Sequence, residues 1–474
     1  MFKRNHNYLI ILLVLSILSR VFTSIYYIED IDSLRFALSI QDYDILSLQP
    51  HFPGYPIFCF IAKILHYIIG NMAISFSIIG GVSIFFIIYY LLRIFNANVK
   101  TYEGQYIALI IFLNPLFWIM SNRYMPDLMG LSIALSSMYY LIYATQQGRH
   151  LEKGFLLAGL LCGVRLSYMP LLFFPIFKIL YSHKNRINLS CFLIFGILIW
   201  LIPMILITGF NDLYAIAQKH TLGHFMDYGG TIFTEQSFKD RLIYLFRSIW
   251  ADGLGGYWSS RGLTSIVITA LLVIQFGTSF KDLRRKWNSN KNMQTFLYCI
   301  IIYFVWILLF QNIIFKSRHV LPLLLFVCIL LIEGQEKYRG KVYTSMIYLF
   351  FIVLIGHDIK LINQHKNYTA IQKLKNHISE NDNIDAIVTI PLINYYLERH
   401  KINADFINVE DSIKIKNFDN MKHTSFNKII MIGDYRSLLS DRYNFANDTT
   451  FYHNPYMNQM WSKIQVYSAN INGQ

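Results

Sequence analysis

The sequence of 474 residues lacks the short motifs of several common enzyme classes. It has no H-E-x-x-H and no cysteine cluster, which disfavours hydrolytic zinc chemistry, and no G-x-S-x-G, which disfavours an acyl-enzyme mechanism. The C-terminal part has neither G-x-G-x-x-G nor a Walker loop, so no nucleotide site is predicted there. The five cysteines have no C-x-x-C spacing and lie in or beside apolar runs, where they are interpreted as packing residues.

Charge is scarce and apolar residues are abundant. Only 15% of the residues are charged while 54% are hydrophobic, and long apolar runs recur through the first three quarters of the chain. This composition predicts a polytopic α-helical membrane protein. The net charge of +14 comes mainly from short loops between the apolar runs. The positive-inside rule explains such a distribution, and the absence of a continuous basic face argues against a nucleic-acid partner.

The basic loops predict a topology of about eleven spans. Residues 8–28 have span length and no cleavage site, so we expect them to stay as the first helix, with Lys3 and Arg4 keeping the N-terminus in the cytoplasm. Residues 29–72 then form the first external loop, which includes a short interfacial helix at 55–69. Further spans are predicted at 73–92, 104–120, 128–145, 154–182 (two short helices), 189–208, 263–280, 295–314, 319–333 and 341–357.

Two other regions fall outside the spans. Residues 209–262 are predicted to be a long external loop with an amphipathic run near 238–250. The domain of spans is therefore expected to cover residues 1–357, followed by an external α/β domain at 358–474. Within that domain we expect a small, mostly parallel sheet, with strands near 386–390, 404–409, 428–432, 449–452 and 464–468 and helices near 371–378 and 392–399.

Carboxylates directly follow the first span. Asp30 and Asp32 could act as a general base toward a hydroxyl or amine, or hold a divalent cation that binds a phosphate. The alternative is a solvated acidic loop that only caps a helix at Asp32 or Ser33. Spacing alone does not choose between these interpretations.

The first loop resembles that of bacterial GT-C glycosyltransferases, relatives of the protein O-mannosyltransferases (glycosyltransferase family 39-like). The resemblance rests on Asp-Ser-Leu-Arg-Phe-Ala-Leu at 32–38, Asp-Tyr-Asp at 42–44 and Pro-His-Phe-Pro-Gly-Tyr-Pro at 50–56. In that superfamily this loop carries the catalytic aspartate. The resemblance implies that Asp32 has this role here, with Asp30 as the second candidate. Many relatives have adjacent Asp-Glu, where this chain has Glu-Asp-Ile-Asp at 29–32.

Two later segments also resemble the family. One is Asn-Pro-Leu-Phe-Trp at 114–118 with Arg-Tyr-Met-Pro-Asp at 123–127, and the other is Ser-Arg-His-Val-Leu-Pro at 317–322. The resemblance covers about residues 8–360. It implies that Arg123 and Asp127 belong to the substrate-binding site, with Asp127 a loose match to a second acidic position.

In this superfamily the donor is a sugar linked to polyprenyl phosphate. The resemblance therefore implies a role for the basic residues expected at the outer face. These residues could neutralise the leaving phosphate, and they are Arg165, Lys316, Arg318 and His319. Arg165 could instead be a buried structural arginine, and Arg318 and His319 could be interfacial anchors. His51 could bind donor or acceptor, or only satisfy its turn.

The sequence therefore predicts a GT-C glycosyltransferase of the cell inner membrane. It would move a hexose or pentose, with inversion, from a polyprenyl-phosphate donor to a lipid, glycan or protein acceptor at the periplasmic or extracellular face. No cofactor is predicted beyond an optional Mg²⁺ or Mn²⁺. The alternatives are a transporter or flippase, and a polymerase, of lipid-linked sugars. Transport would require polar residues near the bilayer midplane, and apart from Arg165 the mid-span positions are nearly uncharged.

Overall fold

A computed structural model of the chain describes residues 6–147, 150–234, 237–289, 291–314, 316–333, 340–381, 384–411, 413, 415–416, 418, 428–439, 444–456 and 458–470. The chain forms two compact units. The first consists of Met1–Tyr26 and Arg35–Lys366, and the second of Tyr27–Leu34 and Asn367–Gln474. The structure thus divides the chain after Lys366, later than the predicted 357, and adds a first-loop segment to the C-terminal unit.

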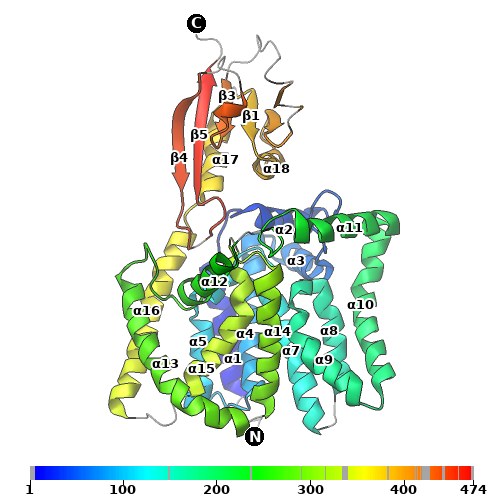
Figure 1. Cartoon of the computed structure of the whole chain (residues 1–474), viewed down its shortest axis with the longest axis vertical. Helices are drawn as coiled ribbons and strands as arrows, with labels where there is room; N and C mark the ends of the chain where they lie inside the picture. The colour runs from blue at the N-terminus through cyan, green and yellow to red at the C-terminus, as the bar shows by residue number, and fades with distance from the viewer. Residues whose placement is uncertain are drawn as a thin grey trace. The chain divides into compact units, whose positions relative to one another are not determined.

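The first unit is a bundle of helices (Figure 1). Helix α2 (Ile31–Gln41) crosses the division between the units. The other helices of the bundle are α1 (His6–Phe22), α3 (Pro56–Ile69), α4 (Met72–Ile94), α5 (Tyr102–Phe112), α6 (Pro115–Asn122), α7 (Asp127–Gln147), α8 (Leu151–Arg165), η2 (Leu166–Tyr168), α9 (Pro170–Ser182), α10 (Arg186–Thr208), α11 (Phe210–Met226), α12 (Phe238–Arg247), η3 (Ser248–Gly253), α13 (Leu263–Ser289), α14 (Lys291–Phe310), η4 (Ser317–Val320), α15 (Leu321–Glu333) and α16 (Lys341–His365).

Every predicted span contains a helix, and 154–182 is two short helices, α8 and α9, as expected. Among the described residues, four helices are long and apolar enough to cross a membrane, namely α4, α10, α14 and the run beginning with α16; the bent pair α5 and α6 makes a fifth. In the other predicted spans the described apolar stretches are 10–17 residues long, for example Asp127–Ile142 and Leu263–Ser279, so the count of about eleven stays a prediction. Large apolar side chains face outward along α10, including Phe195 and Leu206, as on a lipid-facing surface.

The bend between α5 and α6 is built by Asn114. The two helices meet at 52°. The side chain of Asn114 accepts hydrogen bonds from the backbone N–H groups of Leu116 and Phe117, both at 3.1 Å, and Pro115 takes the first helical position. The Asn114 amide also donates to the carbonyl of Gly253 at 2.7 Å, which joins the bend to the π-helix η3.

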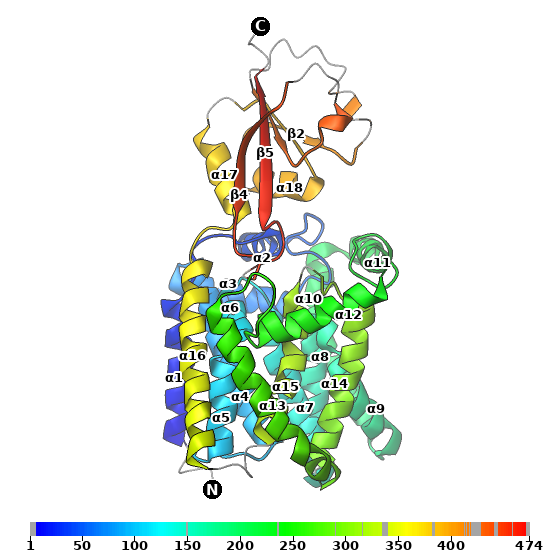
Figure 2. The ribbon, with the colours of Figure 1, turned by 60° about the vertical axis from the view of Figure 1, so that its left-hand side comes forward.

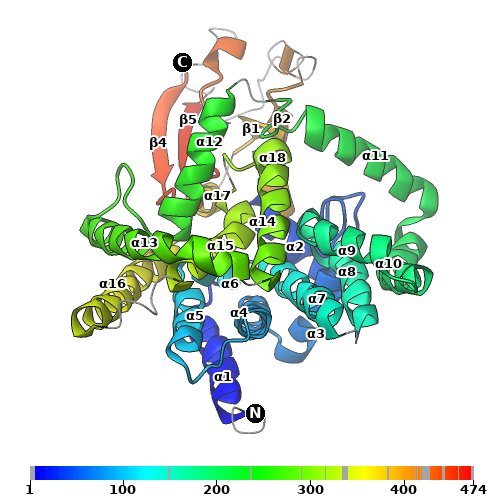
Figure 3. The same ribbon diagram turned by 60° about the horizontal axis from the view of Figure 1, so that its bottom comes forward.

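Small residues allow the bundle helices to pack closely. Figure 3 shows α7, α8, α9 and α10 gathered on one side of the bundle. Where α8 crosses α10, a Cβ atom on Gly159 would lie 2.3 Å from the carbonyl oxygen of Leu193, and one on Gly196 would lie 2.5 Å from that of Leu156. Glycine at both positions lets the two backbones touch, as is common between membrane helices.

The long loop predicted at 209–262 is largely helical. It contains α11, α12 and η3, and the amphipathic run expected near 238–250 corresponds to α12. Arg241 on α12 is fully buried and donates to carbonyl groups near the end of α14. The loop is therefore fixed to the bundle by a buried cation that sequence reasoning did not single out.

The second unit contains a five-stranded sheet in the order β2-β1-β3-β5-β4, of which Figure 1 labels β1, β3, β5 and β4. The strands are β1 (Ala386–Thr389), β2 (Asp405–Asn408), β3 (Lys428–Ile432), β4 (Ala446–Tyr452) and β5 (Lys463–Asn470), and helices α17 (Ala370–Glu380) and α18 (Pro391–Arg399) accompany them. All five predicted strands and both helices are present. A core of Val388, Ile429, Met431 and Tyr467 fills one face of the sheet.

The prediction of a mostly parallel sheet was wrong. β1 pairs in parallel with β2 and β3, but β5 pairs antiparallel with both β3 and β4. The physical reason is the connection between β4 and β5, residues 453–462. It is too short for a crossover helix, so these strands return as a hairpin. The sheet is therefore mixed.

Candidate active site

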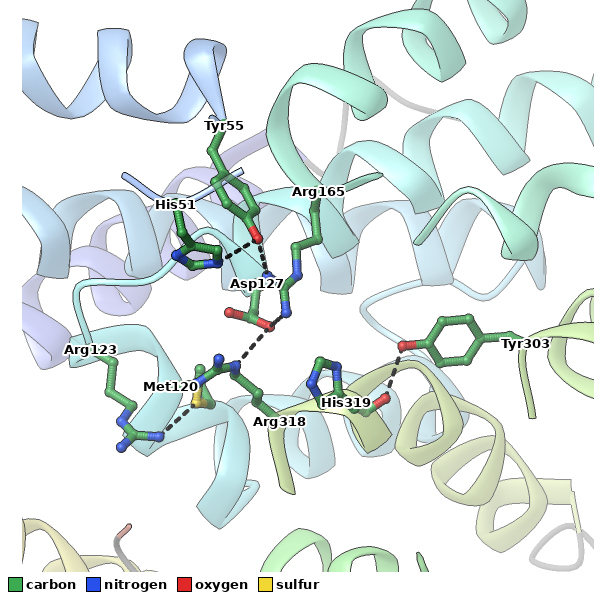
Figure 4. Close-up of polar contacts among 9 residues, drawn as sticks. All are labelled: His51, Tyr55, Met120, Arg123, Asp127, Arg165, Tyr303, Arg318 and His319. Atoms are coloured by element: carbon green, nitrogen blue, oxygen red, sulfur yellow. Dashed lines mark hydrogen bonds and ion pairs between the residues drawn. The ribbon is translucent and has the colours of Figure 1, made fainter. Parts of the chain in front are cut away.

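The first unit contains a buried cluster of charged side chains around Asp127. This carboxylate is fully buried, and its Oδ1 lies 2.9 Å from Nη2 of Arg165 and 3.8 Å from Nε of Arg318. Figure 4 shows the two arginines reaching the carboxylate from opposite sides. Three segments far apart in the sequence, the start of α7, the end of α8 and the turn η4, therefore meet at one acidic group.

Local sequence explains the position of Asp127 and Arg165. Asp127 follows Pro126 and stands in the first turn of α7, where a carboxylate is favoured by the exposed N–H groups and the helix dipole. One turn later, a Cβ atom on Gly130 would lie 2.4 Å from Cβ of Arg165. Only glycine lets α7 and the end of α8 approach closely enough for the ion pair to form.

A second arm of the cluster leads to the first loop. Arg165 Nη1 donates to the Tyr55 hydroxyl at 3.3 Å, and this hydroxyl lies 3.2 Å from Nε2 of His51. Both residues belong to the turn that contains Pro50, Pro53 and Pro56, in which the peptide bonds before Pro50 and Pro53 are cis. His51 is thus tied to the charged cluster through Tyr55.

A third arm runs through the turn η4. The Ser317 hydroxyl donates to Oδ2 of Asp252 at 2.5 Å, and Asp252 Oδ1 is paired with Arg261 at 2.7 Å. Burial raises the pKa of the Asp252 carboxyl, whereas Arg261 and the Ser317 hydrogen bond act in the opposite direction. Because Ser317 precedes Arg318, these contacts fix the start of the turn that presents Arg318 to Asp127.

The other predicted cations lie near the same turn. His319 is buried, its carbonyl accepts a hydrogen bond from Tyr303 at 2.9 Å, and among the described residues its Nδ1 has no hydrogen-bond partner. Lys316 is partly exposed and comes immediately before the turn. Arg123 instead donates to the sulfur of Met120 at 3.7 Å, and Figure 4 shows it apart from the pair of Asp127 and Arg165.

The first-loop carboxylates belong to the second unit. Asp30 and Asp32 are both buried, so the interpretation of a solvated acidic loop does not describe them. Asp30, rather than Asp32 or Ser33, caps α2: its Oδ1 accepts the backbone N–H of Ser33 at 2.8 Å. Asp30 Oδ2 accepts a hydrogen bond from the Asn458 amide at 3.2 Å, while Asp32 stands in the first turn of α2.

Sequence reasoning missed several residues of this site. Tyr55 and Tyr303 resemble the many other tyrosines of an aromatic-rich chain. Asp252 stands beside glycines in Ala-Asp-Gly-Leu-Gly-Gly at 251–256. An isolated carboxylate among apolar residues is the feature of the sequence that could have indicated a site residue there. No group of three or more His, Cys, Asp or Glu side chains that could hold a metal ion is found in the part of the chain that the structure describes.

No protein-family model and no curated protein matches the sequence. Among solved structures, the chain is similar to ArnT from Cupriavidus metallidurans bound to undecaprenyl phosphate, with 10% sequence identity, 97% of each chain covered and a TM-score of 0.53. It is also similar to apo ArnT from the same organism, with 10% identity, 98% of each chain covered and a TM-score of 0.51. The chain therefore has the fold of ArnT over nearly its whole length, and the predicted helical membrane-protein fold with a C-terminal α/β domain is confirmed.

Proposed function

We propose that this protein is a membrane glycosyltransferase that moves a hexose or pentose from a polyprenyl-phosphate donor to a lipid, glycan or protein acceptor. One observation carries the proposal: the chain shares its fold, over 97% of its length, with an ArnT structure that contains undecaprenyl phosphate. The charged cluster of the first unit supplies groups suited to such a donor.

The cluster suits a phosphate because two guanidinium groups share one carboxylate. Asp127 neutralises one positive charge of the pair Arg165 and Arg318, so the three groups together keep a net positive charge. Guanidinium groups bind phosphate oxygens in a planar, two-pronged manner, and this binding strengthens as negative charge develops on a leaving group. Lys316 and His319 flank Arg318 in the chain; the Lys316 ammonium would add to the same field, and the buried His319 ring would act as a neutral hydrogen-bonding group.

Asp32 is the proposed general base, with Asp30 as its support. The acceptor hydroxyl or amine would attack the anomeric carbon of the sugar while its proton passes to the Asp32 carboxylate. The bond between that carbon and the phosphate oxygen breaks, and its electron pair leaves with the polyprenyl phosphate. A single displacement of this kind inverts the anomeric configuration.

The proposed location is the cell inner membrane, with the N-terminus in the cytoplasm and the C-terminal unit at the periplasmic or extracellular face. The asymmetry of the basic loops supports this orientation.

Two substitutions test the proposal in the full-length purified protein. Asp32→Asn should abolish sugar transfer and leave undecaprenyl phosphate binding and the melting temperature near wild type, because it removes a base but keeps the shape. Arg318→Gln should weaken undecaprenyl phosphate binding by about 1.5–3 kcal/mol, the value of a hydrogen bond to a charged group. Arg436→Gln, which breaks an exposed ion pair with Asp434, is the control.

The donor sugar can be identified by mass spectrometry of glycans and lipids from a deletion strain. Transfer is measured with that lipid-linked sugar, and binding with undecaprenyl phosphate alone. Full transfer by Asp32→Asn would remove Asp32 as the base. If the purified protein moved the lipid-linked sugar across the bilayer of vesicles and transferred no sugar to an acceptor, the result would instead favour the transporter alternative.

A further inference from the structure

The first-loop segment Tyr27–Leu34 is a structural part of the C-terminal unit, although more than 330 residues separate the two in sequence. The Tyr27 hydroxyl donates to the carbonyl of Asn367 at 2.9 Å, and its ring packs edge-on against that of Tyr368 at 5.4 Å. These contacts attach the beginning of the segment to the chain that leads into α17.

Three consecutive residues of the segment are each held by a different part of the C-terminal unit. The Tyr396 hydroxyl, from α18, donates to the carbonyl of Ile28 at 3.0 Å. The Thr369 hydroxyl, just before α17, donates to the carbonyl of Glu29 at 3.0 Å. The amide of Asn458, between β4 and β5, donates to Oδ2 of Asp30 at 3.2 Å.

All three donors are buried, and Asn458 is held in place by further hydrogen bonds. Thr369, Tyr396 and Asn458 are 2%, 0% and 7% exposed. The Asn458 side-chain oxygen accepts the N–H of Met460 at 3.0 Å, and its carbonyl accepts Nε2–H of His453 at 2.7 Å. His453 Nδ1 in turn accepts the N–H of Ala370 at 3.0 Å, which fixes the ring tautomer.

We propose that the C-terminal unit is the device that positions the first-loop carboxylates. Asn458, Thr369 and Tyr396 are positioning residues: they fix Asp30 and the backbone before it, and Asp30 caps the helix turn that carries Asp32. This inference rests on the proposed role of Asp32. It gives residues 367–474 a function in the reaction, which they exert through the position of Asp32.

An exchange of the Asp30 and Asn458 side chains tests the inference. In Asp30→Asn the side-chain oxygen is needed to cap α2, and the Asn458 oxygen already accepts the N–H of Met460, so two NH₂ groups face each other. In Asn458→Asp two carboxylate oxygens face each other, so each single change breaks the hydrogen bond. The double variant Asp30→Asn/Asn458→Asp restores an amide facing a carboxylate in the reverse direction, and Asn at position 30 can still cap α2.

Each single variant should lower kcat about 10–100-fold, with the donor KM changed less than threefold, because misplacement of a base by about 1 Å has effects of this size. The double variant should recover to within about fivefold of wild type. Hydrogen exchange of the peptide 27–34 should rise in the single variants and return in the double variant. Asp434→Asn, an exposed carboxylate of the same unit, is the matched control.

Thr369→Val, which removes the bond to Glu29 with little change in shape, should also lower kcat and raise exchange of the same peptide. Single variants with wild-type kcat would overturn the inference, and so would a double variant that regains protected exchange but no activity, since Asp30 would then be the base. An active Asp32→Asn would instead contradict the proposed function, which separates the two failures.

Discussion

At the scale of single residues, Asp252 connects Arg261 to the turn of the proposed donor site. Its two oxygens bind Arg261 and Ser317, and Ser317 begins the turn that presents Arg318. We predict that Asp252→Asn loosens this turn and weakens undecaprenyl phosphate binding about 3–10-fold, with a smaller effect on turnover. The range corresponds to one hydrogen bond of about 0.5–1.5 kcal/mol.

The same carboxyl predicts a pH effect with a defined sign. Its pKa is raised by burial, so it takes up a proton at a higher pH than an ordinary aspartate. The folded state then holds this proton more tightly than the unfolded state. The contribution of Asp252 to stability is therefore fully present at low pH and is lost as the pH rises through its folded pKa.

Acidification should protonate the Asp252 carboxylate, weaken its ion pair with Arg261 and so weaken donor binding. The free energy of unfolding should lose no contribution from Asp252 as the pH falls. The measurement is undecaprenyl phosphate affinity and melting temperature from pH 7 down to pH 5. The acid loss of affinity should shrink in Asp252→Asn. An identical acid profile in the variant would show that another group titrates.

At the scale of secondary-structure elements, Arg241 joins α12 to the end of α14. Its guanidinium donates twice to the carbonyl of Leu308, at 2.8 and 2.7 Å, once to that of Gly230 at 2.6 Å, and once to that of Gln311 at 3.0 Å. The last carbonyl groups of a helix have no partner within the helix, and a cation is favoured beside them. Arg241 supplies both the donors and the charge.

Arg241→Met should therefore destabilise the protein by about 3 kcal/mol, because it keeps the aliphatic stem but leaves buried carbonyl groups unsatisfied. The measurement is thermal unfolding in detergent, with Lys239→Met, an exposed neighbour on α12, as control. Arg241→Lys should recover only part of the loss, since an ammonium group cannot reach all three carbonyl groups. Equal melting temperatures for the two methionine variants would contradict this role.

The elements also show what the sequence could predict. Apolar runs of span length and short β-rich runs give a strong local signal, so α4, α10 and the five strands were expected at nearly their observed bounds. The pairing of those strands depends on a connection that carries no such signal. The parallel sheet was therefore predicted where β4 and β5 form a hairpin.

At the scale of the whole chain, long-range contacts limited the prediction of the site. Asp127, Arg165, Arg318 and His51 were selected individually, and the structure joins them through one ion-pair cluster and Tyr55. No local pattern could reveal that residues 27–34 belong with the C-terminal unit, because their partners are ordinary Thr, Tyr and Asn side chains. Such side chains become specific hydrogen-bond donors to the first-loop segment only once folding has buried them beside it.

The orientation of the bundle gives the last prediction. Figure 2 shows the connection from α4 to α5, the end of α13 and the start of α14 at the same end of the bundle as the start of α1. Arg93 and Lys100 stand near the first of these connections, and Lys184 and Arg186 near the one between α9 and α10. Basic loops favour the cytoplasm, so this end should face inward.

Single cysteines introduced at exposed positions of a cysteine-free variant test this orientation. Asn185→Cys should react with a membrane-impermeant maleimide only after permeabilisation, because it lies in the connection between α9 and α10. Ser259→Cys, between η3 and α13, and Ser437→Cys, in the C-terminal unit, should react in intact spheroplasts. Labelling of Asn185→Cys from outside would invert the bundle, and the proposed transfer would then have to occur on the cytoplasmic face.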